Sequence, residues 1–410
     1  MTPHTSATTT DARAALAGGA TWEPAGAPES VRRFHEACRS IAALAARIGR
    51  RVQLMEVCGT HTVSIFRNGL RAMLPATLRL VSGPGCPVCV TAQRHIDGAI
   101  ELADRPGVTI ATYGDMLRVP GVRGSLEQRR AAGAHVFVVA SARAALDLAR
   151  RSSDRTVVFL GVGFETTAPA TAATVLEAER DGVENFCVLA SHKLVVPAMR
   201  ALLAAGDVPL DGFICPGHVS VIIGARAYEP VAAQDQRPCV ITGFEPVQIL
   251  IGIERLLRQI AERRAAVENT YPEAVSDEGN PAALALLRRV FTVADAPWRE
   301  LGVLPRSGLE FGPRYRRFDA AARFGLVFGD DLDNPACRCG DVIVGKCEPP
   351  ACPLFGTGCT PLRPIGPCMV SGEGTCAAWS RYAGAPAPSA PRRPSGVRAP
   401  ASALPQGGAP

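Results

Sequence analysis

Short apolar runs rich in β-branched residues alternate along the chain with longer stretches in which apolar positions recur every three or four residues. The first pattern is typical of buried strands and the second of amphipathic helices. We expect strands at 52–57, 78–82, 108–112, 135–140, 156–161, 185–190, 212–215 and 239–242. We expect helices at 31–48, 91–103, 142–150, 168–180, 195–203 and 246–264. This alternation predicts an α/β fold with two parallel sheets of the doubly wound type.

The two ends of the chain differ from the rest. Residues 1–28 contain no continuous apolar stretch, and residues 383–410 are dominated by Ala, Pro, Ser, Gly and Arg. Such compositions bury too little apolar surface to form a core, so we expect a flexible lead and a disordered tail. The remaining length exceeds what a single core usually serves, which predicts two or three domains.

Charge and apolar content exclude several function classes. The formal net charge is +6, four arginines near the carboxy terminus account for most of it, and aromatic residues make up only 5%. This gives no footprint for nucleic acid. No apolar run is long enough to span a membrane and no secretory signal is present, so we expect a cytoplasmic protein. Fourteen cysteines in that compartment favour metal binding or redox chemistry over a disulfide framework.

Chemically reactive residues follow the expected strands. The segments that end strands include Cys58-Gly-Thr-His-Thr62, Gly83-Pro-Gly-Cys-Pro-Val-Cys89, Tyr113-Gly-Asp115, Gly163-Phe-Glu-Thr-Thr167, Ser191-His-Lys193, Cys215-Pro-Gly-His218 and Gly243-Phe-Glu245. In open parallel sheets, ligands bind outside the carboxyl ends of the strands. We therefore expect these segments to meet at one or two clefts.

The carboxy-terminal region carries the densest cysteine signal. Seven cysteines lie within 40 residues: Cys337, Cys339, Cys347, Cys352, Cys359, Cys368 and Cys376. Gly- and Pro-rich loops surround them, and such loops can wrap an iron–sulfur cluster and donate amides to its sulfurs. A structural zinc site is the alternative, but this region has neither a C-x₂-C pair nor a histidine, and zinc usually uses such ligands.

Cys58 lies where a strand is expected to turn into a helix, and His61 follows three residues later. Amide donors and the helix dipole at such a turn favour the thiolate, the form that binds metal or acts as a nucleophile. His61 could ligate the same ion, accept a proton or orient the sulfur. The alternative is a buried cysteine that packs as a small apolar group.

Cys86 and Cys89 form a C-x₂-C pair that can become a reversible disulfide or grip a metal. A constrained Gly-Pro-Gly loop precedes the pair and favours redox chemistry over half of a zinc site. Glu165 and His218 could bind a small ligand or relay protons, although each alone is more often structural. No complete dinucleotide fingerprint, P-loop or serine elbow is present.

Taken together, these motifs resemble the HypD family of hydrogenase maturation factors. The resemblance rests on Met55-Glu-Val-Cys-Gly-Thr-His-Thr62, Gly83-Pro-Gly-Cys-Pro-Val-Cys89, Gly163-Phe-Glu-Thr-Thr-Ala-Pro169, Phe213-Ile-Cys-Pro-Gly-His218, Cys352-Pro-Leu-Phe355 and Cys368-Met-Val-Ser-Gly-Glu-Gly-Thr-Cys376. It covers about residues 31–382. The long amino-terminal lead and the Pro-rich tail look like additions to the family pattern.

The resemblance implies a scaffold that assembles the Fe(CN)₂CO unit of [NiFe]-hydrogenases with a small HypC-type chaperone and a HypE-type cyanide donor, before transfer to the hydrogenase large-subunit precursor. It implies two α/β domains that face a cleft, at 29–150 and 151–265, and a carboxy-terminal domain at 266–382 that holds a [4Fe-4S] cluster. Cys58 would hold the Fe(II) under assembly with His61 beside it, and Cys86 and Cys89 would be the redox pair. His61, Glu165 and His218 would handle protons or hydrogen-bond the diatomic ligands.

The family's cluster pattern, C-x₁₄-C-x₆-C-x₁₆-C, is met by Cys337, Cys352, Cys359 and Cys376. Cys339 and Cys368 lie in the same region, so either could replace one of these ligands. Two rival functions remain open at this point. One is an autonomous iron–sulfur thiol–disulfide oxidoreductase, and the other is a zinc-dependent interaction module. An assembly scaffold with redox activity rather than a simple turnover enzyme is our first expectation.

Overall fold

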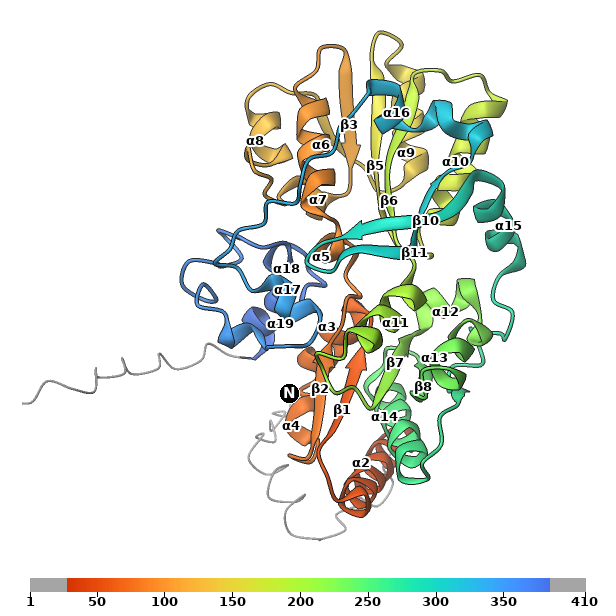
Figure 1. Ribbon diagram of the computed structural model, residues 1–410, viewed down its shortest axis with the longest axis vertical. Coiled ribbons are helices and arrows are strands. Elements are labelled where there is room, and N and C mark those ends of the chain that lie inside the picture. Colours follow the sequence, from red (N-terminus) through yellow and green to blue (C-terminus); the bar gives the residue numbers. More distant parts are fainter. Residues whose placement is uncertain (1–27, 384–410) are drawn as a thin grey trace, which may run out of the picture.

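The computed structural model describes residues 28–383, and two parallel sheets organise it (Figure 1). The first has five strands in the order β2-β1-β7-β8-β9. Its strands are β1 (Val52–Glu56), β2 (Leu78–Ser82), β7 (Gly212–Pro216), β8 (Cys239–Thr242) and β9 (Val267–Asn269). Almost every residue of the four longest strands is buried, as expected for parallel strands covered on both faces.

The second sheet has four parallel strands in the order β4-β3-β5-β6. They are β3 (Val108–Thr112), β4 (Val136–Val138), β5 (Thr156–Gly163) and β6 (Phe186–His192). In both sheets the strand order reverses at an internal neighbour pair, β1 with β7 and β3 with β5. The predicted α/β class with two parallel sheets is therefore confirmed.

The strands are grouped differently from the consecutive division at 29–150 and 151–265. The position 150/151 lies between β4 and β5, which belong to one sheet, while β1 and β2 share the other sheet with β7 to β9. The chain crosses to the four-stranded sheet after β2 and returns after β6. Local patterns show where strands occur, but the partner of each strand depends on contacts distant in sequence, so the exchange was not predicted.

Helices cover both sheets. They are α2 (Glu29–Ile48), α3 (Gly59–Arg67), α4 (Leu70–Met73), α5 (Pro87–Val90), α6 (Gln93–Ala103), α7 (Gly114–Leu117), α8 (Leu126–Ala131), α9 (Ala142–Arg151), α10 (Ala168–Arg180), α11 (Val195–Ala205), α12 (Gly217–Ile223), α13 (Glu229–Ala233), α14 (Pro246–Ala261), α15 (Pro281–Val290), α16 (Ala320–Phe324), α17 (Cys339–Ile343), α18 (Pro367–Val370) and α19 (Thr375–Tyr382), with 3₁₀ turns at Ala225–Tyr228, Pro313–Phe318 and Pro349–Ala351. The apolar faces of α2 and α14 pack on the five-stranded sheet in one buried cluster. No helix among residues 28–383 combines the length and apolarity needed to cross a membrane.

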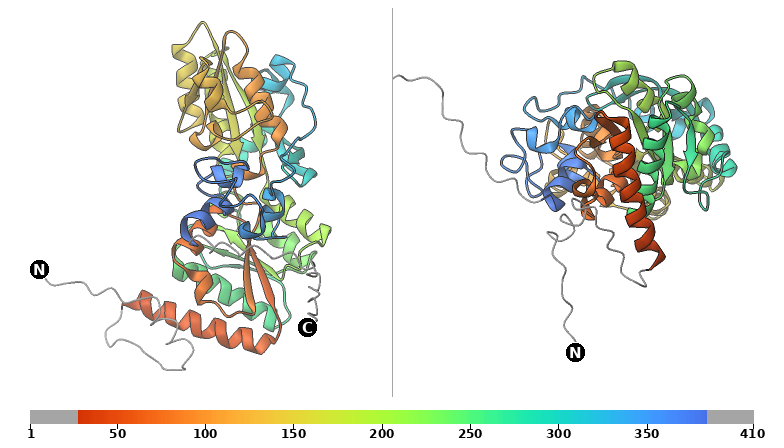
Figure 2. Two further views of the ribbon diagram at one scale, coloured as in Figure 1. Left: turned by 90° about the vertical axis from the view of Figure 1, so that its left-hand side faces the viewer. Right: turned by 90° about the horizontal axis from the view of Figure 1, so that it is seen from below.

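An antiparallel hairpin of β10 (Phe291–Trp298) and β11 (Gly302–Phe311) was not predicted, and it lies between the two sheets in Figure 1. Beyond it, the cysteine-rich segment forms only short helices and turns. Figure 2 shows this segment, in blue, beside the junction of the two sheets. Many of its buried side chains, including Cys359, Cys368 and Cys376, belong to the same hydrophobic cluster as Met55 and Val81 of the five-stranded sheet. The segment is thus held by the main core.

Candidate functional site

The carboxyl ends of β1 and β7 place Cys58 and His218 at the point where the strand order of the five-stranded sheet reverses. Crevices at such reversal points are the usual ligand sites of open α/β sheets. Cys58 is the residue before α3, and His218 is the second residue of α12. The predicted strand-to-helix turn at Cys58 is therefore confirmed.

Burial determines whether the Cys58 thiol is protonated. The side chain is only 8% exposed. Desolvation raises its pKa to about 12, with smaller contributions from the carboxylates of Glu373 and Glu56. Hydrogen bonds from the backbone amides of His61 and Thr60 lower this pKa, but by less than desolvation raises it. The expectation that the helix terminus alone would favour the thiolate is therefore wrong, and a cation is needed to hold this sulfur deprotonated.

Glu56 is a buried carboxyl group beneath Cys58 that the sequence analysis did not single out. One of its oxygens accepts the Thr62 hydroxyl, and the other accepts the Cys58 amide at 3.1 Å. Desolvation raises its pKa to about 8, despite the opposing hydrogen bonds from Thr62 and Ser82. It is therefore mostly protonated at neutral pH. An acidic residue at the last position of a buried strand was the available signal.

His61 is fully buried beside this turn and neutral. Its Nε2 donates to the Gly243 carbonyl oxygen at 2.9 Å, which leaves Nδ1 as the unprotonated nitrogen. Nδ1 has no hydrogen-bond partner among the described residues. Desolvation lowers the pKa of the ring to about 4. A bare imidazole nitrogen in a buried site is suited to bind a metal ion or accept a proton.

Phe244 lies between the two predicted histidines. Its ring centroid is 4.6 Å from that of His61 and 3.9 Å from that of His218, where the rings stack. His218 is exposed, and partial desolvation lowers its pKa, although the nearby Glu373 carboxylate acts in the opposite direction. The structure therefore brings Cys58, His61 and His218 into one locality, with His218 at its solvent side.

Cys86 and Cys89 form a disulfide at the start of α5. Both sulfurs belong to buried residues, 6% and 1% exposed, and the Cys89 amide donates to Cys86 Sγ at 3.3 Å. The preceding residue, Gly85, lies directly on the backbone of Cys58. The disulfide loop and Cys58, the expected iron ligand, are thus packed against each other.

A loop at 371–374 joins the cysteine-rich segment to both sheets. Thr60 donates its hydroxyl to Glu373 at 2.7 Å, and Gly59 lacks the Cβ that would meet the Glu373 backbone. Asp115, which follows β3, accepts the Ser371 hydroxyl at 3.0 Å and the Gly372 amide at 3.2 Å. The contact of Glu373 with Thr60 could not be predicted, because the two residues are 313 positions apart and no local pattern indicates their pairing.

The carboxy-terminal thiols contact one another in series. Cys337 is hydrogen-bonded to Cys339, Cys339 to Cys368, and Cys368 to Cys376. This sharing lowers the pKa of Cys339 and raises the pKa of Cys337 and Cys368. Within residues 28–383, no three His, Cys, Asp or Glu side chains are grouped as metal ligands. Soft sulfur donors suited to iron are therefore close together. Their arrangement in the described residues does not single out which four would bind a cluster.

The other two expected cluster ligands are Cys352 and Cys359, and both are buried. Cys352 is close enough to Cys337 and Cys347 to influence their pKa. Cys359 Sγ accepts the Ile365 amide at 3.3 Å. Amide donors of this kind are common around cluster sulfurs. Gly366 also fits a sulfur-rich site, because a Cβ there would be 2.7 Å from Cys337 Sγ.

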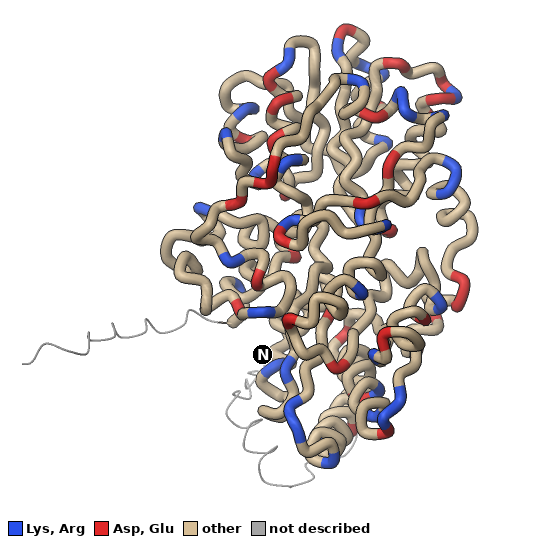
Figure 3. Tube along the Cα trace, in the orientation of Figure 1, with Lys and Arg blue, Asp and Glu red and all other residues tan. Residues whose placement is uncertain are grey.

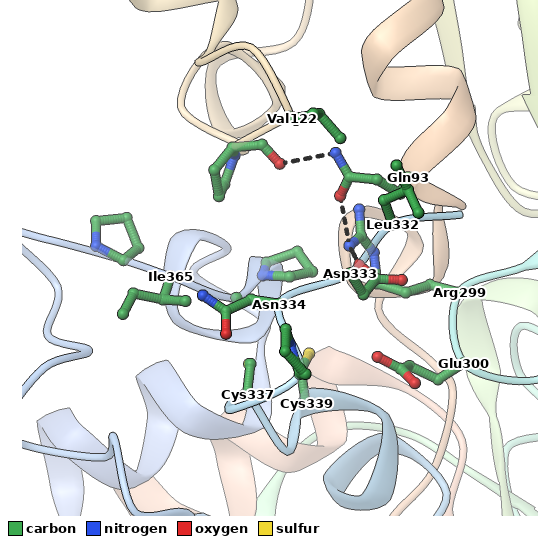
Figure 4. A pocket seen from close by; sticks show the side chains of 16 residues that line it. Gln93, Val122, Arg299, Glu300, Leu332, Asp333, Asn334, Cys337, Cys339 and Ile365 are labelled. Atoms are coloured by element: carbon green, nitrogen blue, oxygen red, sulfur yellow. Dashed lines mark hydrogen bonds and ion pairs between the residues drawn. The ribbon is translucent and has the colours of Figure 1, made fainter. Parts of the chain in front are cut away.

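A pocket of about 490 Å³ opens onto this sulfur-rich region (Figure 4). Cys337 and Cys339 line one wall, and Arg299, hydrogen-bonded to Gln93 at 2.8 Å and paired with Asp333, lines another. Cys337 is partly exposed, whereas Cys58 and the disulfide are buried. Solvent thus has access to one end of the thiol series.

Glu165 lies away from Cys58. Its carboxylate accepts the Val195 amide at 3.0 Å, at the start of α11. Desolvation raises its pKa to about 7, and the group is close enough to Tyr228 to affect the pKa of that phenol. Glu165 therefore caps a helix, and no contact in the described structure connects it to Cys58 or His61.

The fold and site define a thiol-rich α/β protein in which a buried cysteine and histidine stand beside a disulfide, a class suited to handling metal ions and electrons. Residues 32–383 match the HypD family model, described as "Hydrogenase formation hypA family". The chain is 45% identical over 358 residues to the hydrogenase maturation factor HypD of Escherichia coli K12, covering 87% of this chain and 96% of that protein. It is 49% identical over 352 residues to HypD of Azotobacter vinelandii, covering 83% and 93%. The chain belongs to the HypD family of hydrogenase maturation factors.

Proposed function

We propose that this protein is the scaffold on which the Fe(CN)₂CO unit of [NiFe]-hydrogenases is assembled. The observation that carries the proposal is the packing of the Cys86–Cys89 disulfide loop onto Cys58, with His61 Nδ1 left bare beside the same turn. A thiolate and an imidazole nitrogen suit Fe(II). The burial of Cys58 and His61 also keeps water away from an iron centre under construction.

In this proposal iron is the substrate, and the residues of the site compensate its positive charge. The Cys58 thiol gives up its proton when Fe(II) binds, because the dication offsets the desolvation that otherwise keeps the sulfur neutral. Glu56 stays protonated beneath it and accepts the amide that fixes the turn. His61 Nδ1 either joins the iron or accepts the released proton. His218 stands at the solvent side, where diatomic ligands arrive.

The disulfide supplies a two-electron store next to the iron. Its reduction to two thiols consumes two electrons and two protons, and its re-formation releases them. We further propose that Cys337, Cys352, Cys359 and Cys376 hold a [4Fe-4S] cluster, with Cys339 or Cys368 as possible substitutes for one ligand. A [4Fe-4S] cluster bound there supplies single electrons. Helices α17 and α18, which carry Cys339 and Cys368, pack against α5, which carries the disulfide.

The partners follow from the same proposal: a HypC-type chaperone that shares the iron, a HypE-type cyanide donor, and indirectly the hydrogenase large-subunit precursor. A cytoplasmic location is part of it, because free thiols persist in a reducing compartment. The relatives' names support hydrogenase maturation as the process.

Anaerobic co-purification with the chaperone, followed by infrared spectroscopy, tests the proposal. Bands in the cyanide and carbonyl stretching region are expected, and Cys58→Ala should abolish them without removing the visible absorption of the cluster. Cys187→Ala is the matched control, because Cys187 is a fully buried thiol on β6, in the other sheet. Iron-loaded complex without those bands would overturn the scaffold role.

One observation bears on the rival oxidoreductase. The structure contains a disulfide between Cys86 and Cys89, as a thiol–disulfide enzyme requires. Its sulfurs are nearly inaccessible, however, which disfavours attack by an external substrate. Reduction of a small disulfide by the isolated chain at catalytic rates would favour the rival.

A further inference from the structure

A second polar pocket lies at the opposite end of the five-stranded sheet from Cys58. It has a volume of about 210 Å³ and is lined by Arg51, Arg71, Arg79 and Glu348, together with Leu74, Ala76, Leu78 and Leu80. Arg51 immediately precedes β1 and Arg79 is the second residue of β2, the edge strand. Arg51 and Arg79 therefore lie toward the strand ends away from Cys58, whereas Arg71 is close enough to Glu56 to lower the pKa of that carboxyl group. No step of the proposed assembly reaction uses the pocket.

The pocket is strongly basic. Three guanidinium groups face one carboxylate, which leaves a formal charge of +2. In the part of the chain that the structure describes, the Arg51 side chain is exposed and forms no hydrogen bond or ion pair. Basic positions, blue in Figure 3, gather around this end of β1 and β2. A site with an uncompensated double positive charge attracts anions.

Two of the three guanidinium groups are held in place before any ligand arrives. Arg71 pairs with Glu348 and lies 5.1 Å from the Phe66 ring centroid and 5.0 Å from that of Trp379. Arg79 donates to Gln53 at 3.3 Å, and its Nε is 3.8 Å from Glu348. Side chains that are already ordered lose little entropy on binding, so the site is preorganised.

We propose that this pocket binds a phosphate group, either free phosphate or the phosphate of a small ester. Planar guanidinium forks match phosphate oxygens in pairs. The net charge of +2 matches a phosphate dianion better than a single carboxylate. The volume suits one such group rather than a whole nucleotide.

Glu348 is the internal competitor for this ligand. It occupies the same guanidinium groups of Arg71 and Arg79 and is the neighbour of Cys347 in the cysteine-rich segment. A phosphate in the pocket competes with the carboxylate for these groups, so the ion pair weakens phosphate binding. Because such coupling is reciprocal, the state of the cysteine-rich segment and the occupancy of the pocket affect each other.

The test is a titration of the full chain with inorganic phosphate and with phenyl phosphate, at an ionic strength fixed with chloride. Binding is measured by calorimetry and by the fluorescence of Trp379, which lies over Arg71. Saturable binding is expected. Arg51→Gln and Arg79→Gln should each weaken it about fivefold, the loss expected for one charge-assisted contact in a partly exposed site. Glu348→Gln should tighten it, because the competitor is gone.

Arg226→Gln is the matched control, since it removes one positive charge from a distant exposed ion pair. It should leave the affinity unchanged, and Trp379→Phe should remove the fluorescence change but not the calorimetric signal. Absence of saturation, equal effects of the pocket and control variants, or weaker binding by Glu348→Gln would each overturn the proposal. Tighter binding of a hexaglutamate peptide than of either phosphate would also overturn it. A stronger response to phenyl phosphate than to phosphate identifies an ester as the natural form.

Discussion

Gly85 lies so close to Cys58 that a Cβ on the glycine would stand 2.2 Å from the Cys58 amide nitrogen. The Gly59 amide also donates to the Gly85 carbonyl at 3.4 Å. The turns that follow β1 and β2, two neighbouring parallel strands, therefore share one backbone contact. This contact sets the Cys86–Cys89 disulfide next to the candidate iron ligand.

Replacement of Gly85 by Ala should separate these two turns. The added methyl group overlaps backbone atoms of Val57 and Cys58, which cannot move as freely as a side chain. We expect a loss of about 1–3 kcal/mol in the free energy of unfolding, the usual range for overpacking. Denaturant unfolding under anaerobic conditions measures it.

Gly329→Ala is the control for this variant, because a Cβ there would meet no atom within 4 Å. It should leave the unfolding free energy nearly unchanged. Equal stability of the two variants would show that the close approach of Gly85 to Cys58 does not affect the free energy of unfolding.

The sequence allowed the strands to be placed but not grouped. Residues 52–57 and 156–161 were predicted because apolar β-branched residues are buried on both faces of a parallel strand. That β1 pairs with β7, some 160 residues later, could not be predicted, since pairing between distant parallel strands leaves no local pattern. The hairpin of β10 and β11 was missed for a different reason. Its residues alternate only weakly between buried and exposed positions.

The cysteine and histidine residues of the site could be predicted, because few other roles suit these residue types after a strand. Cys58, His61 and His218 meet because they follow strands that end at one edge, which is a property of the fold class. Glu165 follows a strand too, but that strand belongs to the other sheet, and its carboxylate is used by α11. The raised pKa of Glu56 could not be predicted, because the effect of burial on a carboxyl group depends on neighbours that only the folded chain provides.

The raised pKa of Glu165 predicts a specific dependence of stability on pH. Burial raises this pKa from 4.5 to about 7, so the folded protein binds the proton more tightly than the unfolded chain. The stabilisation is complete below pH 4.5 and is lost as the pH rises through 7. Glu165→Gln has no such proton, so its stability relative to wild type should improve between pH 5 and about 8.

Thermal unfolding of both proteins across this pH range measures the effect. Glu184→Gln, at a carboxylate for which the structure gives no side-chain contact, should follow the wild-type curve. Parallel curves for wild type and Glu165→Gln would mean that the carboxyl group titrates normally in the folded protein.

The contact of Asp115 with the loop at 371–374 predicts a local effect rather than a global one. Asp115→Ala leaves the Ser371 hydroxyl and the Gly372 amide without their acceptor. A hydrogen bond to a charged group contributes about 1.5–3 kcal/mol, less where solvent replaces the acceptor. We expect faster amide hydrogen exchange in this loop, and little change in β3 itself. Unchanged exchange at Gly372 and Glu373 would contradict a docking role for Asp115.

Single replacements in the cysteine-rich segment should separate cluster ligands from their neighbours. Cys359→Ser and Cys352→Ser are expected to lose iron, acid-labile sulfide and visible absorption, whereas Cys339→Ser and Cys368→Ser should retain them. The reason is the spacing C-x₁₄-C-x₆-C-x₁₆-C, which includes Cys352 and Cys359 but neither Cys339 nor Cys368. An accepted amide does not separate the two groups, because Cys359 and Cys339 both accept one. Anaerobic reconstitution with iron and sulfide counting measures the result. Loss of the cluster in Cys339→Ser with retention in Cys359→Ser would place the metal on the thiol series itself, because thiols that already contact one another in sequence would then outweigh the spacing of the motif.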